Sequence, residues 1–274
     1  MYLPCQFKLY AHVSEQNLRP ASNSITYWTD FVEKYYDSSV VEKWCYGSCN
    51  NLEVLGIRKR MYADSLIAQH CRICGLTSKG HYKANKEFLP LVFKFKFDNG
   101  VMKEKLDLSE SAMITISPKG KIMLEYGKAV RQIIYRDFAV SQQGKLHVIF
   151  TEDMKILSWE FCAQVLHVPI PPPLPNAQPE NESEREERLS RQTKQVYMEM
   201  RKVKVNYLGL PQLYSQCFQL SNNFEFMRDI MRFSIRHKLG PLESYRKYSA
   251  KSILKKALTT AMKTQDEANI CILM

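Results

Sequence analysis

The chain has 274 residues, of which 45% are hydrophobic and 11% aromatic, so it can bury a full core and should form one main domain plus an appendage. Lys and Arg outnumber Asp and Glu by 39 to 28, a balance that favours acidic or polyanionic partners without indicating base-specific nucleic-acid binding. No window approaches the roughly 20 apolar residues of a membrane span, and the first residues lack the apolar core of a signal peptide, so a soluble intracellular protein is expected.

The amino-terminal region predicts two helices. Residues 5–16 can form a short amphipathic helix that ends before Pro20. Ser22, Asn23 and Ser24 offer capping side chains to a second helix. The apolar residues of this second helix recur at helical spacing: Trp28, Phe31, Val32, Tyr35 and Tyr36. They form one stripe, so we expect the helix to pack in the core.

Cysteines are concentrated in the next segment. It contains two close pairs with histidines nearby: Cys45/Cys49, Cys71/Cys74, His70 and His81. Four such ligands can hold zinc in a tetrahedron, but the first pair has the looser spacing, and buried reduced thiols on neighbouring strands account for the same residues. We therefore expect no metal ligands and no other cofactor here, with a structural zinc site as the alternative.

Residues 87–108 predict a β-hairpin. In the first strand, phenylalanines at 93, 95 and 97 alternate with Lys94 and Lys96, and Asn99-Gly100 has the composition of a tight turn. Alternating basic and aromatic residues also occur on nucleic-acid-binding surfaces. A half-solvated strand produces the same pattern, and this is the interpretation that we favour.

Residues 121–166 predict an antiparallel meander. Gln143-Gly144 and Glu152-Asp153 are expected to be its turns. Between them Leu146, Val148 and Phe150 alternate with Lys145, His147 and Ile149. The next strand, 156–162, places Leu157, Trp159 and Phe161 on one face, and Ile156, Ser158, Glu160 and Cys162 on the other. The pattern indicates a sheet that is covered on one side and partly wet on the other.

The composition changes after Val168. Five prolines between Pro169 and Pro175 exclude helix and central strand, so an extended linker should end the domain. A polar helix is expected over 182–205. A second helix is expected over 223–238, because Asn222 and Glu225 have capping-box spacing and Gly240-Pro241 follows its end.

The second of these helices is broadly apolar and needs cover from neighbouring helices or from another protein. Its apolar members are Phe224, Phe226, Met227, Ile230, Met231, Phe233 and Ile235. A basic amphipathic segment follows up to about residue 266. The chain ends in CILM, a formal prenylation motif at Cys271. Because nothing else supports an anchor, we do not expect a membrane protein and keep lipidation of Cys271 as an alternative.

Several segments carry a resemblance to a known family. They are NSITYWTDFVEKYYDSSVVEKWC (23–45), HCRICG (70–75), IMLEYGKAV (122–130), GKLHVIFTEDMKILSWEFCA (144–163) and GPLESYRKY (240–248). In this order they resemble the plant SEUSS and SEUSS-like transcriptional co-regulators, which belong with the LIM-domain-binding (LDB/Chip) adaptor proteins. The resemblance covers most of residues 1–250.

The resemblance implies an α+β fold: an NTF2-like curved antiparallel sheet with amino-terminal helices, then the proline linker and a carboxy-terminal helical appendage. It implies a dimerisation domain over 1–168, a linker and polar helix over 169–205, a helical partner-binding segment over 206–248, and a basic tail over 249–274. On that segment the implied partner-binding residues are Cys217, Leu220, Phe224, Met227, Ile230 and Met231.

The function implied by the resemblance is that of a nuclear, non-enzymatic adaptor. It would form a homodimer and bridge LUFS-domain WD40 co-repressors of the LEUNIG type to DNA-bound transcription factors, without sequence-specific nucleic-acid contacts of its own. The alternative is a basic nucleic-acid-binding protein with a structural zinc site. An enzyme would require acid–base candidates such as His147, Glu160 and Asp98 to face one cavity, and no catalytic residues are expected.

Overall fold

The computed structural model describes residues 4–46, 69–78, 81–108, 110–167, 181–206 and 208–250. Cys49, the proline linker and the basic tail with Cys271 lie outside the described residues, so the expectations about them stay predictions. The chain divides into two compact units, residues 1–222 and 223–274. The first unit therefore continues beyond Val168, where the sequence suggested that the domain ends.

The first unit is built on a seven-stranded sheet in the order β4-β1-β9-β8-β7-β5, with β6 also paired to β7. The strands are β1 (Tyr36–Cys45), β4 (His81–Asn85), β5 (Lys103–Asp107), β6 (Met113–Ile116), β7 (Ile122–Ile134), β8 (Ala139–Phe150) and β9 (Ile156–His167). All neighbours are antiparallel except β1 and β9, which run parallel. A separate two-stranded sheet joins β2 (Gln69–His70) to β3 (Thr77–Ser78).

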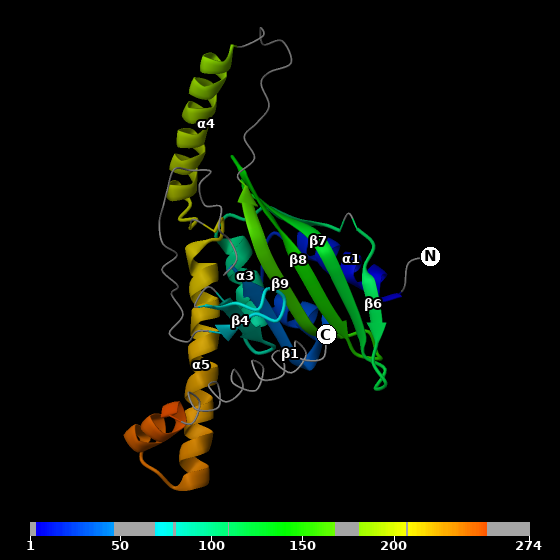
Figure 1. Ribbon diagram of the computed structural model, residues 1–274, viewed down its shortest axis with the longest axis vertical. Coiled ribbons are helices and arrows are strands. Elements are labelled where there is room, and N and C mark those ends of the chain that lie inside the picture. Colours follow the sequence, from blue (N-terminus) through cyan, green and yellow to red (C-terminus); the bar gives the residue numbers. More distant parts are fainter. Residues whose placement is uncertain are drawn as a thin grey trace, which may run out of the picture. The chain divides into compact units, whose positions relative to one another are not determined.

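Three helices pack with this sheet: α1 (Pro4–Asn17), α2 (Ile25–Tyr35) and α3 (Leu89–Asp98). Ser24 caps α2, since its hydroxyl accepts a hydrogen bond from the Tyr27 amide. Trp28 of α2 stacks on Phe93 and Phe97 of α3, with ring centroids 5.3 and 5.4 Å apart. The long strands β7, β8 and β9 lie across these helices (Figure 1). The expected α+β fold, a curved sheet with helices, is confirmed, but the sheet is not wholly antiparallel as expected, because β1 and β9 run parallel.

The hairpin predicted over 87–108 is wrong, because its first strand is helix α3. Pro90 fits the first turn of a helix, and Val92, Phe93, Lys96 and Phe97 are buried at helical spacing. Asn99 ends the helix, and only the return strand, β5, forms as expected. Lys96 was expected in solvent, yet it is buried.

The turn predicted at Gln143-Gly144 is also wrong. These residues lie inside β8, where the pairing with β9 shifts register in a β-bulge. A Cβ on Gly144 would approach the carbonyl oxygen of Cys162 to 2.1 Å, so glycine is required there by the neighbouring strand and not by a turn. The turn at Glu152-Asp153 is confirmed between β8 and β9.

The alternation predicted for β8 is confirmed, with Leu146, Val148 and Phe150 buried. In β9 one assignment changes. A second register shift, opposite Ile149 and Phe150, turns Ile156 to the core side with Trp159 and Phe161. Both bulges place one more residue on β9 than on its partner, so strict alternation from the sequence fails at each.

A charged network lies inside the core of the first unit. Arg131 donates two hydrogen bonds to Glu104, from Nε to Oε1 and from Nη2 to Oε2, each 2.9 Å long. Lys96 Nζ donates to Glu104 Oε2 at 3.0 Å and to Gln16 Oε1 at 2.7 Å. All three charged residues are buried. Burial would raise the pKa of Glu104, but the charges of Arg131 and Lys96 lower it to about 2.

His12 is a second buried titratable group. Its Nε2 shares a hydrogen bond of 2.8 Å with the Tyr36 hydroxyl, and that hydroxyl donates to the buried Glu42. Burial, and after it the nearby charge of Lys96, lower the pKa of His12 to about 3. His12 is therefore neutral in the folded chain and belongs to the packed core.

Two long helices follow the sheet: α4 (Glu182–Lys202) and α5 (Gln212–His237). Asn181 and Glu184 form a capping box at the start of α4. Helix α5 begins eleven residues before the expected start at residue 223, so Asn222 lies within the helix and does not cap it. Among the described residues, no helix is long and apolar enough to cross a membrane.

Candidate protein-interaction helix

The start of α5 is fixed against the sheet of the first unit. The Asn206 side chain accepts hydrogen bonds from the amides of Leu208 and Leu210. Gln142 Nε2 donates to the Leu208 carbonyl at 2.9 Å, and the Tyr135 hydroxyl donates to the Gly209 carbonyl at 3.0 Å. Gly209 has a φ of +73°, and a Cβ there would approach Val140 to 2.3 Å. This tight approach requires glycine.

The first half of α5 belongs to the core. Its buried side chains recur at helical spacing: Tyr214, Cys217, Phe218, Ser221 and Asn222. Phe218 packs against Tyr82 of β4 and Tyr214 of its own helix. The sequence between residues 206 and 222 therefore completes the first unit and does not form a free appendage.

The second half of α5 packs on a short helix formed by residues 241–250. Phe226 contacts Tyr245 and Tyr248, and Phe233 also contacts Tyr248. The Tyr248 hydroxyl donates to the Asp229 carboxylate at 3.3 Å. These aromatic contacts cover one side of α5 within the second unit.

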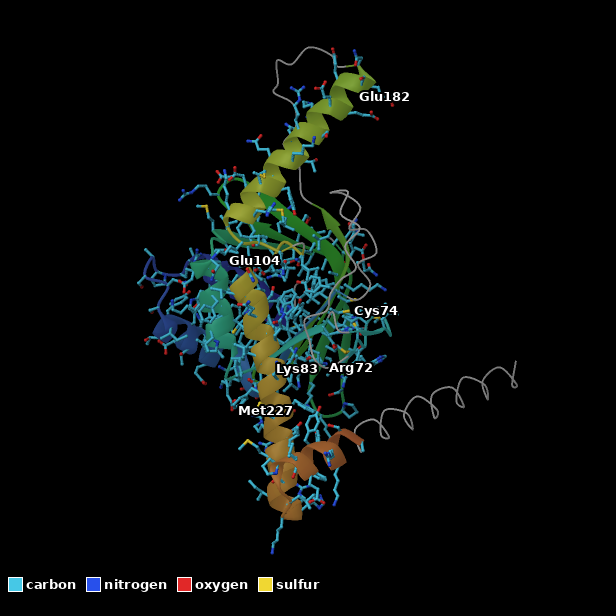
Figure 2. All side chains as sticks on the ribbon, turned by 90° about the vertical axis from the view of Figure 1, so that its left-hand side faces the viewer. Arg72, Cys74, Lys83, Glu104, Glu182 and Met227 are labelled. Atoms are coloured by element: carbon cyan, nitrogen blue, oxygen red, sulfur yellow. The ribbon has the colours of Figure 1, made fainter. Side chains whose placement is uncertain are left out.

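Another side of α5 carries an apolar stripe exposed to solvent. In the second unit we define the α5 stripe as Phe224, Met227, Met231 and Ile235, which are 46, 60, 61 and 77% exposed. Their spacing of three and four residues places them within a narrow arc of the helix. Leu220, one turn earlier in the first unit, is also exposed. Figure 2 marks Met227 on this helix. Large exposed apolar surfaces of this kind are typical of interaction sites.

The implied partner-binding residues fall into two groups. Leu220, Phe224, Met227 and Met231 are exposed, and Ile230 is half-buried at their flank. Cys217 differs, because its side chain is 4% exposed and packs in the core cluster. Burial raises the pKa of its thiol to about 11. Ile235 extends the exposed stripe by one further turn and was not among the implied partner-binding residues, although it was named among the apolar residues of the helix.

Basic residues outnumber acidic ones around the stripe. Between residues 223 and 250 the sequence has six Lys or Arg and three Asp or Glu. Arg232 and Arg236 are exposed on α5, and Arg232 lies 3.9 Å from Asp229, at the limit of an ion pair. The stripe is therefore an apolar strip with a mainly positive border.

The acid–base candidates named from the sequence do not converge. His147 and Glu160 are register partners on β8 and β9, but each has another neighbour. Glu125 lies 3.5 Å from His147, and Lys43 forms an ion pair of 2.9 Å with Glu160. Asp98 is at the end of α3 and accepts a hydrogen bond from Asn23. His147 and Glu160 thus lie on paired strands, whereas Asp98 lies at the end of a helix.

A shallow hollow lies where α4 ends and α5 begins. Its lining is mostly polar and consists of Arg201, Lys204, Val205, Asn206, Gln212, Ser215, Gln216 and Gln219. This lining contains neither a carboxylate nor a histidine, so it offers no pair of groups for acid–base chemistry.

Four cysteines come together beside β1 and β9: Cys45, Cys71, Cys74 and Cys162. The sequence indicated three of them. Cys162 was assigned only to a strand face, although it lies in the WEFCA motif on which the resemblance rests. Its place opposite Cys45 depends on the parallel pairing of β1 with β9, which local sequence does not reveal.

The curved sheet and its helices define the class of this protein: an α+β domain followed by a helical segment. A family model described as "LIM-domain binding protein" matches residues 7–246. The chain belongs to this family, and the resemblance drawn from the sequence is confirmed.

The relatives are plant transcriptional regulators from Arabidopsis thaliana. "Probable transcriptional regulator SLK3" is 29% identical over 95% of this chain and 41% of its own length. "Probable transcriptional regulator SLK2" is 28% identical over 89% of this chain and 33% of its length. "Transcriptional corepressor SEUSS" is 27% identical over 88% of this chain and 29% of its length. The chain thus spans less than half of each of these relatives.

Two solved structures are similar at low identity. AusH from Aspergillus nidulans matches 58% of this chain and 82% of its own, with 12% identity and a TM-score of 0.31. A phenazine biosynthesis-related protein from Pseudomonas aeruginosa matches 65% of this chain and 94% of its own, with 8% identity and a TM-score of 0.27.

Proposed function

We propose that this protein is a non-enzymatic transcriptional co-regulator adaptor that acts in the nucleus. In this proposal it forms a homodimer through the NTF2-like domain and bridges a LUFS-domain co-repressor of the LEUNIG type to DNA-bound transcription factors. The family and the names of the relatives support the co-regulator role. The observation that carries the proposal is the α5 stripe, which lies in the helical segment where the family resemblance implies partner binding.

The stripe has the chemistry of a helix-in-groove ligand. Phe224, Met227 and Met231 offer an aromatic ring and two flexible thioethers along one helix face, which suits an apolar groove on a partner. The border carries Arg232 and Arg236, so the groove should be edged with acidic residues. Electrostatic attraction would then raise the association rate, while the apolar contacts would slow dissociation.

Dimerisation is supported by an apolar part of the sheet edge. All four residues of β6 are exposed, and three of them are large and apolar: Met113, Ile114 and Ile116. An edge strand with such residues is a surface that pairing with a second copy would cover. We assign the homodimer contact to the NTF2-like domain and name β6 as its candidate strand.

The partner site is tested by a double substitution in the stripe. Met227→Glu with Met231→Glu places two charges where the groove would be apolar, so affinity for a purified LUFS domain of a LEUNIG-type co-repressor should fall at least about 30-fold, as expected for the loss of ~2 kcal/mol at a hot spot. Calorimetry or surface plasmon resonance measures this affinity. Unchanged affinity of the double variant would refute the assignment.

The matched control uses Met198, another exposed methionine, which lies on α4 and is 55% exposed. Met198→Glu introduces one such glutamate on an exposed helical surface outside α5, and binding should be retained. A loss of binding in this control as well would indicate a general charge effect.

Bivalency is tested separately by sedimentation of the full chain. A homodimer is expected at micromolar concentration, and Ile114→Lys with Ile116→Lys should shift it toward monomer if β6 forms the contact. A wild-type chain that remains monomeric would remove the bridging part of the proposal. In that case the assignment of the α5 stripe as the partner site would depend on the binding measurement alone.

Salt dependence separates the adaptor from a direct nucleic-acid binder. Counterion release makes DNA affinity fall steeply with salt, whereas the apolar stripe should keep most of its affinity for the partner. Strong, salt-sensitive binding to a DNA duplex, together with no affinity for the LUFS domain, would favour the nucleic-acid function.

A further inference from the structure

The four-cysteine cluster is assembled from two places in the sheet and one turn. Cys45 is the last residue of β1, and Cys162 is its direct register partner on β9. Both are buried. The two other members, Cys71 and Cys74, come from the connection between β2 and β3. Residues far apart in the sequence therefore present four sulfur atoms to one point.

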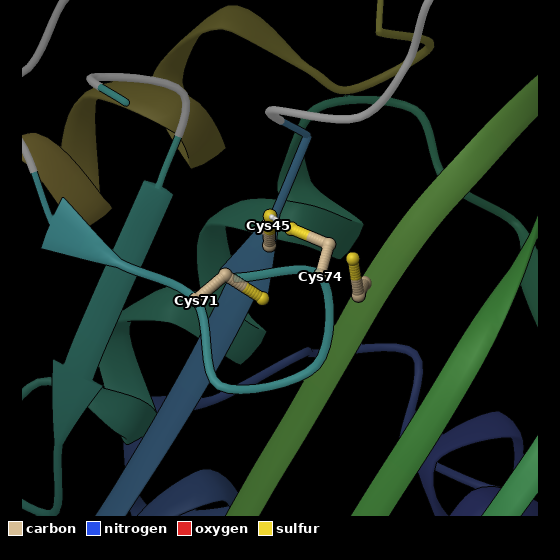
Figure 3. Close-up of side chains that lie close together, drawn as sticks. Cys45, Cys71 and Cys74 are labelled. Atoms are coloured by element: carbon tan, nitrogen blue, oxygen red, sulfur yellow. Dashed lines mark hydrogen bonds between the residues drawn. The ribbon is translucent and has the colours of Figure 1, made fainter. Parts of the chain in front are cut away.

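The connection between β2 and β3 has the form C-x-x-C-G. The Cys71 amide donates to the Leu76 carbonyl at 2.9 Å, and the Gly75 amide donates to the Cys71 carbonyl at 3.0 Å. Gly75 has a φ of +72°, a conformation that glycine adopts without strain. The turn is closed by these hydrogen bonds, and it presents Cys71 and Cys74 together (Figure 3).

The distances suit one tetrahedral ion. The four sulfur atoms lie within 4.8 Å of one another, and the Sγ atoms of Cys45 and Cys74 are 3.8 Å apart. Zinc–sulfur bonds of about 2.3 Å in a tetrahedron separate the sulfur atoms by about 3.8 Å. A disulfide would need about 2.05 Å, and none of the four cysteines forms a disulfide.

The cluster is largely shielded from water, because Cys45, Cys71 and Cys162 are buried and Cys74 is half-buried. Zinc binds cysteine as the thiolate, and a cation would balance the negative charge of sulfur atoms packed this closely.

We propose that Cys45, Cys71, Cys74 and Cys162 bind one structural Zn²⁺ ion. Four protein sulfurs complete the tetrahedron and leave no open position for substrate, which is typical of a structural and not a catalytic zinc site. The proposal replaces the expectation of no metal. It also changes the ligand set considered from the sequence, because Cys162 supplies the fourth sulfur and neither histidine is a ligand.

The ion would join the turn between β2 and β3 to the end of β1 and the middle of β9. His81, which bonds Cys71, would serve as an outer partner that orients this sulfur. A structural zinc site contributes directly to folding, because the unfolded chain holds no preformed site. The proposal does not depend on the adaptor function, since neither the α5 stripe nor β6 is part of the cluster.

The metal content of the full chain tests the proposal directly. The protein is purified under reducing conditions without chelator and without added metal, and its zinc is measured by mass spectrometry. About one zinc ion per chain is expected. A wild-type chain that contains no zinc, and that takes up none in titration against a zinc indicator, would overturn the proposal.

Substitutions assign the ligands. Cys74→Ser and Cys162→Ser should each lose most of the bound zinc, whereas Cys5→Ser, a matched change at another buried cysteine on α1, should keep about one ion per chain. Full zinc in either cluster variant would refute that cysteine as a ligand and, with it, the four-sulfur site.

Cobalt gives a measurement that does not depend on the variants' solubility. Wild-type chain reconstituted with Co²⁺ should show intense visible bands of tetrahedral coordination and thiolate charge-transfer bands in the near ultraviolet. Addition of Zn²⁺ should abolish both. Weak bands typical of six-coordinate cobalt, or no thiolate bands, would contradict a four-cysteine site.

Discussion

The core around Glu104 and the outer face of α5 distribute polarity in opposite ways. In the core, Arg131 and Lys96 share one buried carboxylate, while on α5 the side chains of Met227 and Met231 are exposed to solvent. Figure 2 labels Glu104 and Met227, one from each region. The first region places charge where water is excluded, and the second places apolar surface where water is present.

The difference separates stability from recognition. Each member of a buried ion pair is needed for stability, because removing one member leaves the other as an uncompensated buried charge. An exposed methionine contributes little to folding and gains free energy only when a partner covers it. Substitutions in the Glu104 network should therefore destabilise the protein, and substitutions in the α5 stripe should remove binding without destabilising it.

The largest effect is expected for Glu104→Ala. It leaves Arg131 and Lys96 as two buried cations without their carboxylate, so the free energy of unfolding should fall by about 3–5 kcal/mol. Urea denaturation followed by circular dichroism measures this loss. As a control, Glu187→Gln removes an exposed pair with Arg191 and should leave stability nearly unchanged. Equal stability of both variants would mean that the buried network does not stabilise the fold.

A smaller effect is expected from acid. The pKa of His12 falls from its ordinary value of 6.5 to about 3 in the folded state, so the unfolded chain binds more protons between these values and stability should decline as the pH falls through them. Glu104, with a folded pKa of about 2, adds to the decline below about pH 4.5. By pH 5 the loss from His12 should amount to about 2 kcal/mol.

Denaturation series at several pH values measure the slope. His12→Gln removes one titrating group and should flatten the slope between pH 6.5 and 4.5, even if its stability at neutral pH is lower. An unchanged slope would show that His12 is not the group responsible.

The smallest effect on stability is expected within α5 itself, from two neighbouring phenylalanines. Phe226 packs against Tyr245 and Tyr248, so Phe226→Ala should destabilise the second unit by about 1–3 kcal/mol. Phe224 is exposed, so Phe224→Ala should change stability by less than about 0.5 kcal/mol while weakening partner binding. Hydrogen exchange of residues 223–250 and affinity for the LUFS domain measure the two effects. If Phe224→Ala destabilised the second unit and Phe226→Ala weakened partner binding, the assignment of one residue to packing and the other to binding would be reversed.

Much of the first unit could be predicted because local patterns agreed with the final packing. The capped stripe of Trp28, Phe31 and Val32 gave α2, and the alternation of Leu146 and Val148 gave β8. Phe93 and Phe97 were misassigned to a strand, because the alternation of Phe and Lys fits the two-residue period of a strand and also the i, i+4 spacing of a helix. The helical alternative was decided by packing against Trp28, which lies far away in the sequence.

The candidate sites were predicted unevenly for a similar reason. Local spacing was enough to place Met227 and Met231 on one helix, and the resemblance gave them a role. Exposure was not predictable from the sequence, as Cys217 shows, because the sequence did not reveal that the first half of α5 packs in the core of the first unit. Cys162 joins Cys45 only through pairing between distant strands, so the cysteine cluster could not be completed from the sequence.

The parallel pairing of β1 with β9 has a consequence for the order of folding. Its partners are distant along the chain, since Lys43 and the Glu160 to which it is bonded are 117 positions apart. During synthesis the edge of β1 that pairs with β9 stays uncovered until the whole meander has been made. The nascent chain would thus expose an unpaired β-edge for several seconds at typical translation rates, and early pairing with β4 and protection by chaperones would decide how much of the protein escapes aggregation.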